Sequence, residues 1–365
     1  MRHVIEEIGS EFWIDDRINT GNDLHHDFKK NGFYGDRRLL LSGRTAIDYI
    51  CHDIRRERKV STVYMPVYCC DSMIFPFKNQ NINVIFYDIN YENGKMKCDI
   101  DTTLKIDILY ICNYFGFSIG VDIEVVKCMR DRGVIVLYDK THDFFNNENI
   151  LSLISDYTFC SLRKWIGIPT GAIVAKRDGY FFQTSLRDCD FAEDKYKGMR
   201  MKCSYLQGNM DITKEDFLRL FVSFNRALLK DYRNYLIDKT SLQLLYKQDF
   251  ERIKARRQQN ARLLYDKLSK LNNISMMFQY RNNSVPLFVP ILVKKEVRNS
   301  LRDYLINNKV YCPIHWPKSH SLPSFMRADV FYDSELSLVC DQRYDERQME
   351  KVVNLIENYY NRTNI

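Results

Sequence analysis

Short apolar runs alternate with helix-like segments in the first half of the chain, and this alternation most limits the folds open to it. The runs predict strands over residues 60–65, 84–87, 106–112 and 134–138, with helices over 70–78 and 123–132. Each run is apolar at consecutive positions, which is typical of strands covered on both faces. We therefore predict an α/β fold with a mostly parallel sheet covered by helices.

Polar side chains follow several of these strands directly. Asp88, Asn113 and Asp139 each stand at the carboxyl end of a predicted strand, and the segment after Phe159 falls at the same edge. Ligands of parallel sheets collect at that edge. Four such groups at one edge are hard to explain by packing alone, so we expect a ligand site there.

Lys164 lies in the segment after Phe159, at a break between two apolar, β-prone runs. A lysine held by a rigid frame in an apolar setting can lose its proton and attack a carbonyl group. Most lysines are exposed, so a surface lysine on a hairpin is the alternative for Lys164 taken alone. Its neighbours must decide between the two interpretations.

The turn Ser42 to Thr45 precedes a predicted helix that begins at Ala46. Small and hydroxyl residues at a helix start leave free backbone N–H groups, which suit a phosphate. Plain capping of the helix is the alternative.

The remaining pattern divides the chain into three predicted parts. Residues 1–36 form an arm, residues 37–250 a large domain, and residues 251–365 a smaller α+β domain. The basic run 252–262 is interpreted as a solvated face of a helix that joins the two domains. Residues 188–208 are charged, aromatic and poorly periodic, which predicts a solvated loop or a substrate contact.

Composition excludes several classes of protein. The chain of 365 residues has 54 Lys and Arg against 47 Asp and Glu, so its net charge is +7. This excess is spread along the chain, which favours a small anionic ligand over nucleic acid. The 11 cysteines are scattered without a CxxC pair, so we expect no metal site and no disulfide framework but reduced thiols in the cytoplasm. No signal peptide and no apolar run of about 20 residues is visible, so no membrane span is expected.

The predicted helix start, the acid and the lysine together fit a site for pyridoxal phosphate. In such a site a lysine condenses with the cofactor aldehyde, and a carboxylate faces the ring nitrogen. A helix start with hydroxyl groups holds the phosphate. The chain offers these parts in the order Gly43 to Ala46, Asp139 and Lys164.

In this arrangement the chain resembles the fold-type-I pyridoxal-phosphate aminotransferases, and within them the sugar aminotransferase family called DegT/DnrJ/EryC1/StrS. The matching segments agree in order and spacing and lie at residues 42–46, 64–70, 86–89, 114–116, 137–142 and 159–165. The resemblance covers most of the chain from Leu39 onward. It implies a large domain with a mostly parallel sheet of the seven-stranded type, followed by the smaller C-terminal α+β domain.

The resemblance also implies a role for individual residues. By position, Lys164 matches the family's cofactor-binding lysine and its general acid and base, and Asp139 matches the partner of the ring nitrogen. His142 stands where the family usually has glutamine, close to the cofactor oxygen. The implied contacts around the cofactor phosphate and ring further include Gly43, Arg44, Thr45, Ala46, Asn113 and Ser161.

Departures from the family pattern indicate a divergent branch. Cys70 takes the place of the usual aromatic residue over the ring, so Tyr68 or Tyr114 is expected to stack there instead. Ser161 precedes the lysine by three residues, a shorter spacing than in many members. Candidate substrate contacts are His315, Trp316 and Arg343, with a packed turn and a surface ion pair as the alternatives.

The resemblance implies a homodimer whose active site is shared between subunits, acting on small molecules in the cytoplasm. The amino group of a donor, expected to be glutamate, would pass to a keto group of a nucleotide-linked sugar for surface polysaccharide synthesis. A non-sugar keto substrate, an elimination or dehydration, and a non-catalytic regulator are the alternatives. Lys164 argues against the sugar dehydratases of this fold, in which histidine replaces the lysine, and the intact pair of Lys164 and Asp139 argues against the regulator.

Overall fold

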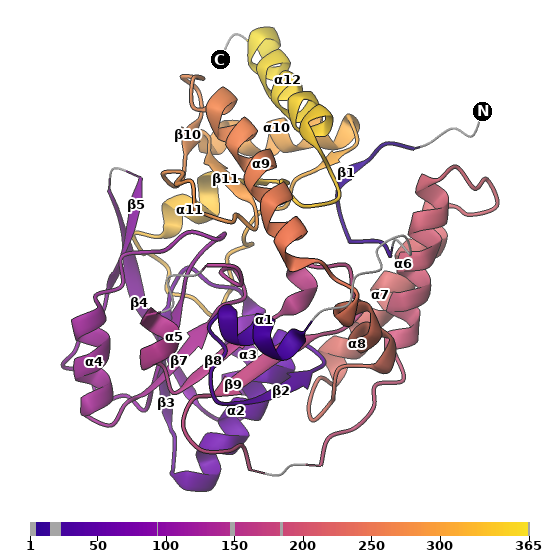
Figure 1. Ribbon diagram of the computed structural model, residues 1–365. Coiled ribbons are helices and arrows are strands. Elements are labelled where there is room, and N and C mark those ends of the chain that lie inside the picture. The colour runs from indigo at the N-terminus through magenta and orange to yellow at the C-terminus, as the bar shows by residue number, and fades with distance from the viewer. Residues whose placement is uncertain (1–4, 15–22, 93, 147–149, 183–184, 364–365) are drawn as a thin grey trace.

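An eight-stranded sheet forms the centre of the computed structural model, which describes residues 5–14, 23–92, 94–146, 150–182 and 185–363 (Figure 1). The strand order is β2-β9-β8-β7-β6-β3-β4-β5. The strands are β2 (Asp36–Leu40), β3 (Thr62–Pro66), β4 (Asn83–Glu92), β5 (Lys95–Asp99), β6 (Ile108–Cys112), β7 (Ile135–Asp139), β8 (Tyr157–Cys160) and β9 (Ala172–Lys176).

The middle of this sheet is parallel, and its edges are antiparallel. Strands β4, β3, β6, β7 and β8 pair parallel with their neighbours, whereas β9 with β8, β2 with β9, and β5 with β4 pair antiparallel. Every residue of β6, β8 and β9 is buried, as the consecutive apolar positions predict. The predicted α/β fold is therefore confirmed, and β5 adds one strand to the expected seven.

Helices cover the sheet and begin where its strands end. The helices of this part are α1 (Leu24–Lys30), α2 (Gly43–Glu57), α3 (Asp71–Lys78), α4 (Ile123–Asp131), α5 (Ile150–Ile154) and the short 3₁₀-helix η1 (Leu162–Lys164). Helix α2 packs on β8 and β9, whereas α4 and α5 pack on β7. Nine of the ten positions of α2 from Thr45 to Ile54 are buried and only His52 is exposed, so this helix lies deep in the structure.

Two long helices, α6 (Ala192–Leu206) and α7 (Lys214–Lys230), pack side by side and project from the body, followed by α8 (Lys239–Tyr246) (Figure 1). The prediction of a loop over residues 188–208 is wrong, because α6 occupies most of this range. Its buried positions include Lys195 and Lys202, which hides the apolar period of the helix. The Lys195 ammonium lies 2.9 Å from a Glu11 carboxylate oxygen, and Lys202 lies 2.9 Å from the Ser10 hydroxyl.

A smaller lobe follows α9 (Phe250–Leu268). Its other elements are β10 (Ser275–Met276), β11 (Val289–Leu292), α10 (Lys295–Asn307), β12 (Val310–Tyr311), α11 (Asp329–Ser334), β13 (Glu335–Leu338) and α12 (Glu346–Thr363). Strands β10, β11 and β13 form an antiparallel sheet, and β1 (Ile8–Gly9) of the N-terminal segment pairs with β12. The division of the chain at residues 36 and 250 stays a prediction.

One residue of the basic run on α9 is not solvated. Arg257 is 1% exposed, and its guanidinium donates to the carbonyl oxygens of Leu287 at 3.0 Å and Trp165 at 3.2 Å. It therefore ties α9 to both the smaller lobe and η1. The prediction of a solvated face is wrong at this position, while Arg252 and Gln259 on the same helix are exposed.

Replacing Arg257 with alanine should lower the free energy of unfolding by roughly 3 kcal/mol, because buried carbonyl groups lose charged hydrogen-bond donors. Urea unfolding of Arg257→Ala, followed by circular dichroism, measures this change. Arg252→Ala is the matched control on the exposed face of α9. An equal, small effect of both substitutions would contradict the structural role of Arg257.

Candidate active site

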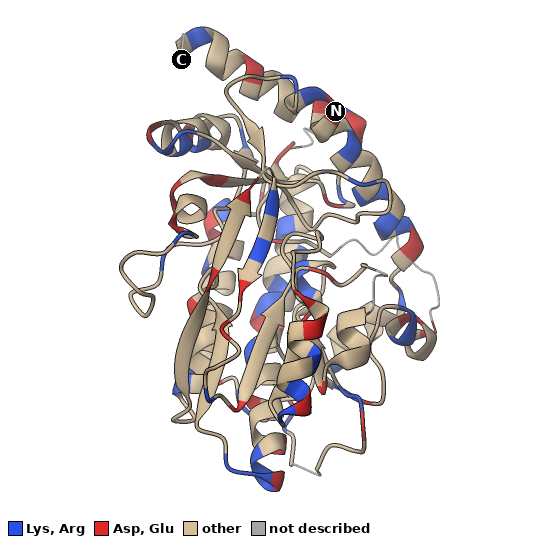
Figure 2. Ribbon diagram, turned by 90° about the vertical axis from the view of Figure 1, so that its left-hand side faces the viewer, with Lys and Arg blue, Asp and Glu red and all other residues tan. Residues whose placement is uncertain are grey.

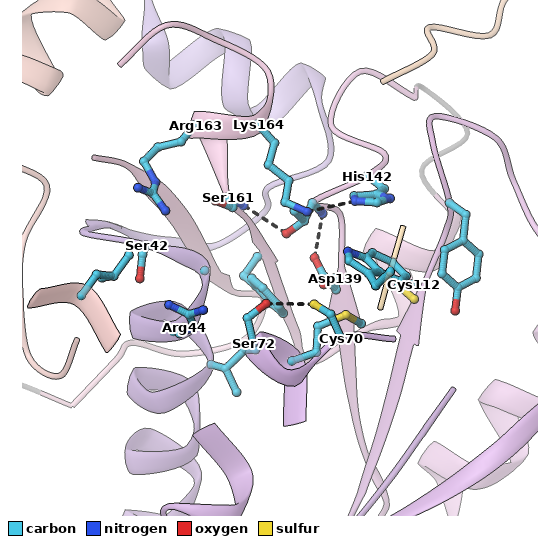
Figure 3. A pocket seen from close by; sticks show the side chains of 18 of the residues that line it. Ser42, Arg44, Cys70, Ser72, Cys112, Asp139, His142, Ser161, Arg163 and Lys164 are labelled. Atoms are coloured by element: carbon cyan, nitrogen blue, oxygen red, sulfur yellow. Dashed lines mark hydrogen bonds between the residues drawn. The ribbon is translucent and has the colours of Figure 1, made fainter. Parts of the chain in front are cut away.

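A cavity opens at the carboxyl ends of β6, β7 and β8 (Figure 3). The start of α2, the turn before α3, and η1 complete its wall. The residues predicted from the sequence that line it are Gly43, Arg44, Cys70, Asn113, Tyr114, Asp139, His142, Ser161, Lys164 and Trp316. The structure thus brings together residues that are more than 250 positions apart in the chain.

Lys164 reaches this cavity from η1, which joins the antiparallel strands β8 and β9. Two contacts fix η1 against the segment after β7: the Ser161 N–H donates to the Thr141 hydroxyl at 3.1 Å, and the Trp165 indole N–H donates to the Thr141 carbonyl at 2.8 Å. The Lys164 Nζ lies 3.1 Å from the His142 Nε2. Burial lowers the pKa of Lys164, and Asp139 partly opposes that shift. A lowered pKa raises the fraction of free amine, which is the nucleophilic form.

Asp139, the last residue of β7, is held by two hydrogen bonds. Its Oδ1 accepts from the Thr141 N–H at 2.7 Å, and its Oδ2 accepts from the Tyr110 hydroxyl at 2.5 Å. Burial raises the pKa of this carboxyl, while both hydrogen bonds and Lys164 favour its charged form. Tyr110 was not predicted, because a tyrosine inside an apolar strand is usually a core residue.

His142 lies beside the lysine as a neutral ring. Burial holds the pKa of His142 well below its ordinary value. Its Nδ1 lies 3.5 Å from the Phe115 backbone N–H, which can only donate. The proton of the neutral ring therefore lies on Nε2 and points at the Lys164 amine, an arrangement that requires the uncharged amine as acceptor.

The opposite end of the cavity is cationic. Arg44 and Arg163 both line it, beside Ser161 and the N-terminus of α2 at Ser42 (Figure 3). The Arg163 Nε is buried without a hydrogen-bond partner. Neither arginine forms an ion pair with another of the described residues. Burial lowers the pKa of both guanidinium groups. An arginine stays charged in spite of such a shift, so this end can accept an anion.

Glycine at position 43 keeps that end open. A Cβ atom added there would lie 3.3 Å from the Ser161 Cβ, which is tighter than an ordinary contact. The hydroxyl of Ser42 accepts from the Thr45 N–H at 3.3 Å, so it caps α2. Arg163 was not predicted from the sequence, because an arginine next to the candidate lysine looks like a second surface cation.

Three of the predicted residues lie behind the cavity wall rather than in it. Thr45 and Ala46 are buried within α2 and do not line the cavity. Tyr68 is fully buried, with its ring 5.0 Å from that of Tyr114 and its hydroxyl bonded to the His315 carbonyl. Of the predicted residues Tyr68, Tyr114 and Trp316, it is Tyr114 and Trp316 that line the cavity.

His315 and Arg343 line a second cavity, which also reaches Lys164 and Arg163. Arg343 pairs with Asp341 at 2.8 Å, and both side chains are buried. The ion pair therefore exists but does not lie on the surface, as the alternative had it. The Arg343 guanidinium lies over the rings of Phe12 and Trp13. The second cavity lies between η1, the N-terminal segment and the smaller lobe.

Over the described parts of the chain, no helix is long and apolar enough to cross a membrane. The same residues contain no group of three or more His, Cys, Asp or Glu side chains in metal-binding geometry. Acidic and basic residues are interspersed over both lobes (Figure 2).

Comparison with solved structures identifies the class of fold, although no family model and no curated protein matches the sequence. A DegT DnrJ EryC1 StrS aminotransferase from Brucella abortus matches with a TM-score of 0.60 at 12% identity, over 94% of this chain and 91% of that one. The sugar aminotransferase CalS13 from Micromonospora echinospora matches with a TM-score of 0.55 at 11% identity, over 88% and 87%. NtdA from Bacillus subtilis, solved with bound cofactor PMP, matches with a TM-score of 0.58 at 14% identity, over 93% and 78%.

The chain therefore has the fold of these aminotransferases, as the resemblance in its sequence implied. Its own residues also fit pyridoxal phosphate. The unpartnered Arg163 Nε, the Arg44 guanidinium and the start of α2 suit a phosphate at one end of the cavity. At the other end, Asp139 and Lys164 supply the carboxylate and the amine that the cofactor ring requires.

The lowered pKa of Lys164 can be tested by competitive labelling. Acetic anhydride attacks only free amines, so Lys164 should reach half-maximal labelling at a lower pH than an exposed lysine such as Lys59. Peptide mass spectrometry after brief labelling from pH 7 to 11 gives both profiles. If Lys164 labels at the same pH as Lys59 or above it, the uncharged amine beside His142 is contradicted.

Proposed function

We propose that this protein is a pyridoxal-phosphate-dependent aminotransferase. The observation that carries the proposal is one buried cavity with Lys164 and Asp139 at one end and two unpaired arginines at the other. The fold shared with the aminotransferases supports it.

When bound, pyridoxal phosphate supplies an aldehyde and an electron-withdrawing ring. The Lys164 amine would hold the cofactor through that aldehyde and would serve as the general acid and base for the substrate proton. Asp139 would hold the ring nitrogen in its charged form. Because Thr141 and Tyr110 hold both of its oxygens, its carboxylate is already oriented before the ring enters.

The groups at the cationic end have a binding role. Arg44, Arg163, Ser161 and the N–H groups at the start of α2 would hold the phosphate. His142 orients the Lys164 amine through the hydrogen bond at 3.1 Å. Tyr114, Phe159 and Trp316 are aromatic residues of the cavity lining that could contact the ring, and Cys70 lines the same cavity.

The substrates we propose are an amino donor, glutamate, and a keto acceptor, the keto group of a nucleotide-linked sugar. The second cavity supports this part, since it reaches Lys164 and is rich in arginine, as an anionic substrate requires. The sugar aminotransferase among the structural neighbours favours a sugar acceptor. Synthesis of a surface polysaccharide in the cytoplasm is the setting that we propose.

Lys164→Ala should abolish the visible absorbance of the bound cofactor and reduce amino transfer by roughly a thousandfold, because the amine and the proton carrier are both lost. Spectra of the purified protein after addition of pyridoxal phosphate measure the first effect. Borohydride reduction of the wild type should attach the cofactor to the peptide that contains Lys164. Lys127→Ala, an exposed lysine, is the control.

A protein that never takes up pyridoxal phosphate would end the proposal. Adding glutamate to the loaded protein separates transfer from elimination or dehydration. Conversion of the cofactor to its amine form supports an aminotransferase, whereas loss of water or another leaving group from the substrate supports the alternative. Cofactor binding without reaction of any donor would favour a regulator.

We further propose a homodimer in which both subunits contribute to the site. Its support on this chain is an apolar stripe on α7, formed by Leu218, Val222 and Leu229, which are 41%, 47% and 60% exposed. Positions four and eleven apart lie on one face of a helix. A different face of α7 packs through Phe217, Phe221 and Phe224. The packing of a single subunit therefore leaves this apolar stripe exposed.

Charged residues in this stripe should separate the subunits. Val222→Asp combined with Leu229→Asp should shift the mass in light scattering to that of one chain, 43.6 kDa, because each dimer would bury the added carboxylates. Met210→Asp is the control, since Met210 is 88% exposed at the turn before α7. A wild-type protein that is monomeric and active would contradict the shared site.

A further inference from the structure

A buried chain of hydrogen bonds joins Glu335 and Ser337 to His315, which lines the second cavity. The His315 Nδ1 lies 2.8 Å from the Ser337 hydroxyl, which is in turn bonded to the Glu335 Oε1. The other carboxyl oxygen, Oε2, accepts the backbone N–H of His315 at 2.7 Å. Glu335 and Ser337 are 0% exposed and His315 is 7% exposed, so water has little access to the chain.

Glu335 lies in this chain as a neutral acid. Among the residues that the structure describes, it has no ion-pair partner, and Arg298, the charge that acts on it, donates to the Tyr332 carbonyl. An unpaired carboxylate is expensive to bury, whereas the neutral acid is not. Burial accordingly raises the pKa of Glu335 to about 8.

The positions of the protons follow from these contacts once Glu335 is neutral. Because Oε2 accepts an N–H, the proton of the neutral acid lies on Oε1, and the hydrogen bond between Oε1 and the Ser337 hydroxyl then runs from the acid to the Ser337 oxygen. The Ser337 hydroxyl proton is then donated to the His315 Nδ1. A neutral imidazole whose Nδ1 accepts carries its proton on Nε2. His315 therefore offers an N–H donor, and not a lone pair, on its other side.

His315 lines the second cavity, which has an excess of positive charge. The cations that line this cavity are Arg163, Arg257, Arg302 and Arg343, against the carboxylates of Glu11 and Asp341, and the Lys164 amine also reaches it. Both carboxylates are already paired, Glu11 with Lys195 and Asp341 with Arg343. Burial holds the pKa of His315 well below its ordinary value, so the ring stays uncharged among these cations.

We propose that Glu335 and Ser337 are positioning residues that hold His315 as an uncharged N–H donor for an oxyanion of the substrate in the second cavity. The ligand chemistry is a carboxylate or a phosphate, which corresponds to the amino donor or to a nucleotide-linked acceptor. The identity of the ligand as a substrate rests on the proposed function. The direction of the proton chain does not, because it follows from the burial of Glu335 without an ion-pair partner among the described residues and from its contacts with Ser337 and His315.

Ionisation of Glu335 reverses the chain. Above its pKa the Ser337 hydroxyl donates to the carboxylate, and the Ser337 oxygen accepts a proton from the His315 Nδ1. The Nε2 then carries a lone pair that repels an oxyanion. Other titratable groups face this chain, Tyr68 and Cys312 near Glu335 and Lys164 and His142 near His315, so pH alone does not isolate its effect.

The substitution Glu335→Gln isolates the effect of Glu335 ionisation. The amide oxygen can accept the His315 N–H and the amide nitrogen can donate to Ser337, which mimics the neutral acid at every pH. Two-bond ¹H–¹⁵N spectra of the full-length protein, assigned by comparison with His315→Asn, report the tautomer of His315. The wild type should carry the proton on Nε2 at pH 6.5 and on Nδ1 at pH 9.5, whereas Glu335→Gln should keep it on Nε2 at both. Any other tautomer in the wild type at pH 6.5, or the same pH change in Glu335→Gln, would overturn the proposal.

Binding of glutarate and of pyrophosphate, measured by calorimetry, tests the donor itself. The anion that binds shows whether a carboxylate or a phosphate is the natural group. Its affinity should fall about tenfold more between pH 6.5 and 9.5 in the wild type than in Glu335→Gln, and Ser337→Ala should bind it weakly at both. Binding of neither anion would refute the oxyanion site. Failure to take up pyridoxal phosphate would instead refute the proposed function, since neither measurement uses turnover.

Discussion

The position of the candidate site depends on the hydrogen bonds of one residue, Thr141. Its N–H fixes the carboxylate of Asp139, its hydroxyl accepts the Ser161 N–H, and its carbonyl accepts the Trp165 indole N–H. The end of β7 and the segment that carries Lys164 are therefore held by the same residue. Because Trp165 is fully buried, η1 cannot turn away from the sheet without exposing a large aromatic surface. The distance between acid and amine is thus a property of the framework rather than of two flexible side chains.

Buried cations, more than the overall net charge, indicate what this molecule binds. Arg163 and Arg257 face the two cavities with their Nε atoms unpartnered, whereas Lys195 pairs with the Glu11 carboxylate and Lys202 donates to the Ser10 hydroxyl and the Glu11 carbonyl. A folded chain tolerates such groups where carbonyl oxygens, carboxylates or a ligand compensate them. Carbonyl oxygens surround the Arg257 guanidinium, whereas Arg163 has no carboxylate partner among the described residues, which leaves Arg163 able to bind an anion. The net charge of +7 also favours an anionic ligand, but it does not indicate where that ligand binds.

The sequence was sufficient for the features that depend on local pattern. Consecutive apolar positions predicted the parallel strands, and the order of helix start, acid and lysine predicted which segments meet at the sheet edge. It was insufficient where a buried residue is polar. Helix α6 was missed because Lys195 and Lys202 occupy inward positions, and Arg257 looked solvated for the same reason. Partners of these side chains lie far away in the chain, so their burial leaves no local signal.

Strand β13 shows the same limit at the second cavity. Its sequence alternates Glu335, Leu336, Ser337 and Leu338, which is the period of a strand with one polar face in water. In the structure all four residues are buried, and the polar face is turned inward against His315. The neighbouring Trp316 meanwhile lies 5.3 Å from the His142 ring in the first cavity. One short segment of the smaller lobe therefore reaches both cavities that meet at Lys164, so a movement of this lobe would alter both walls at once.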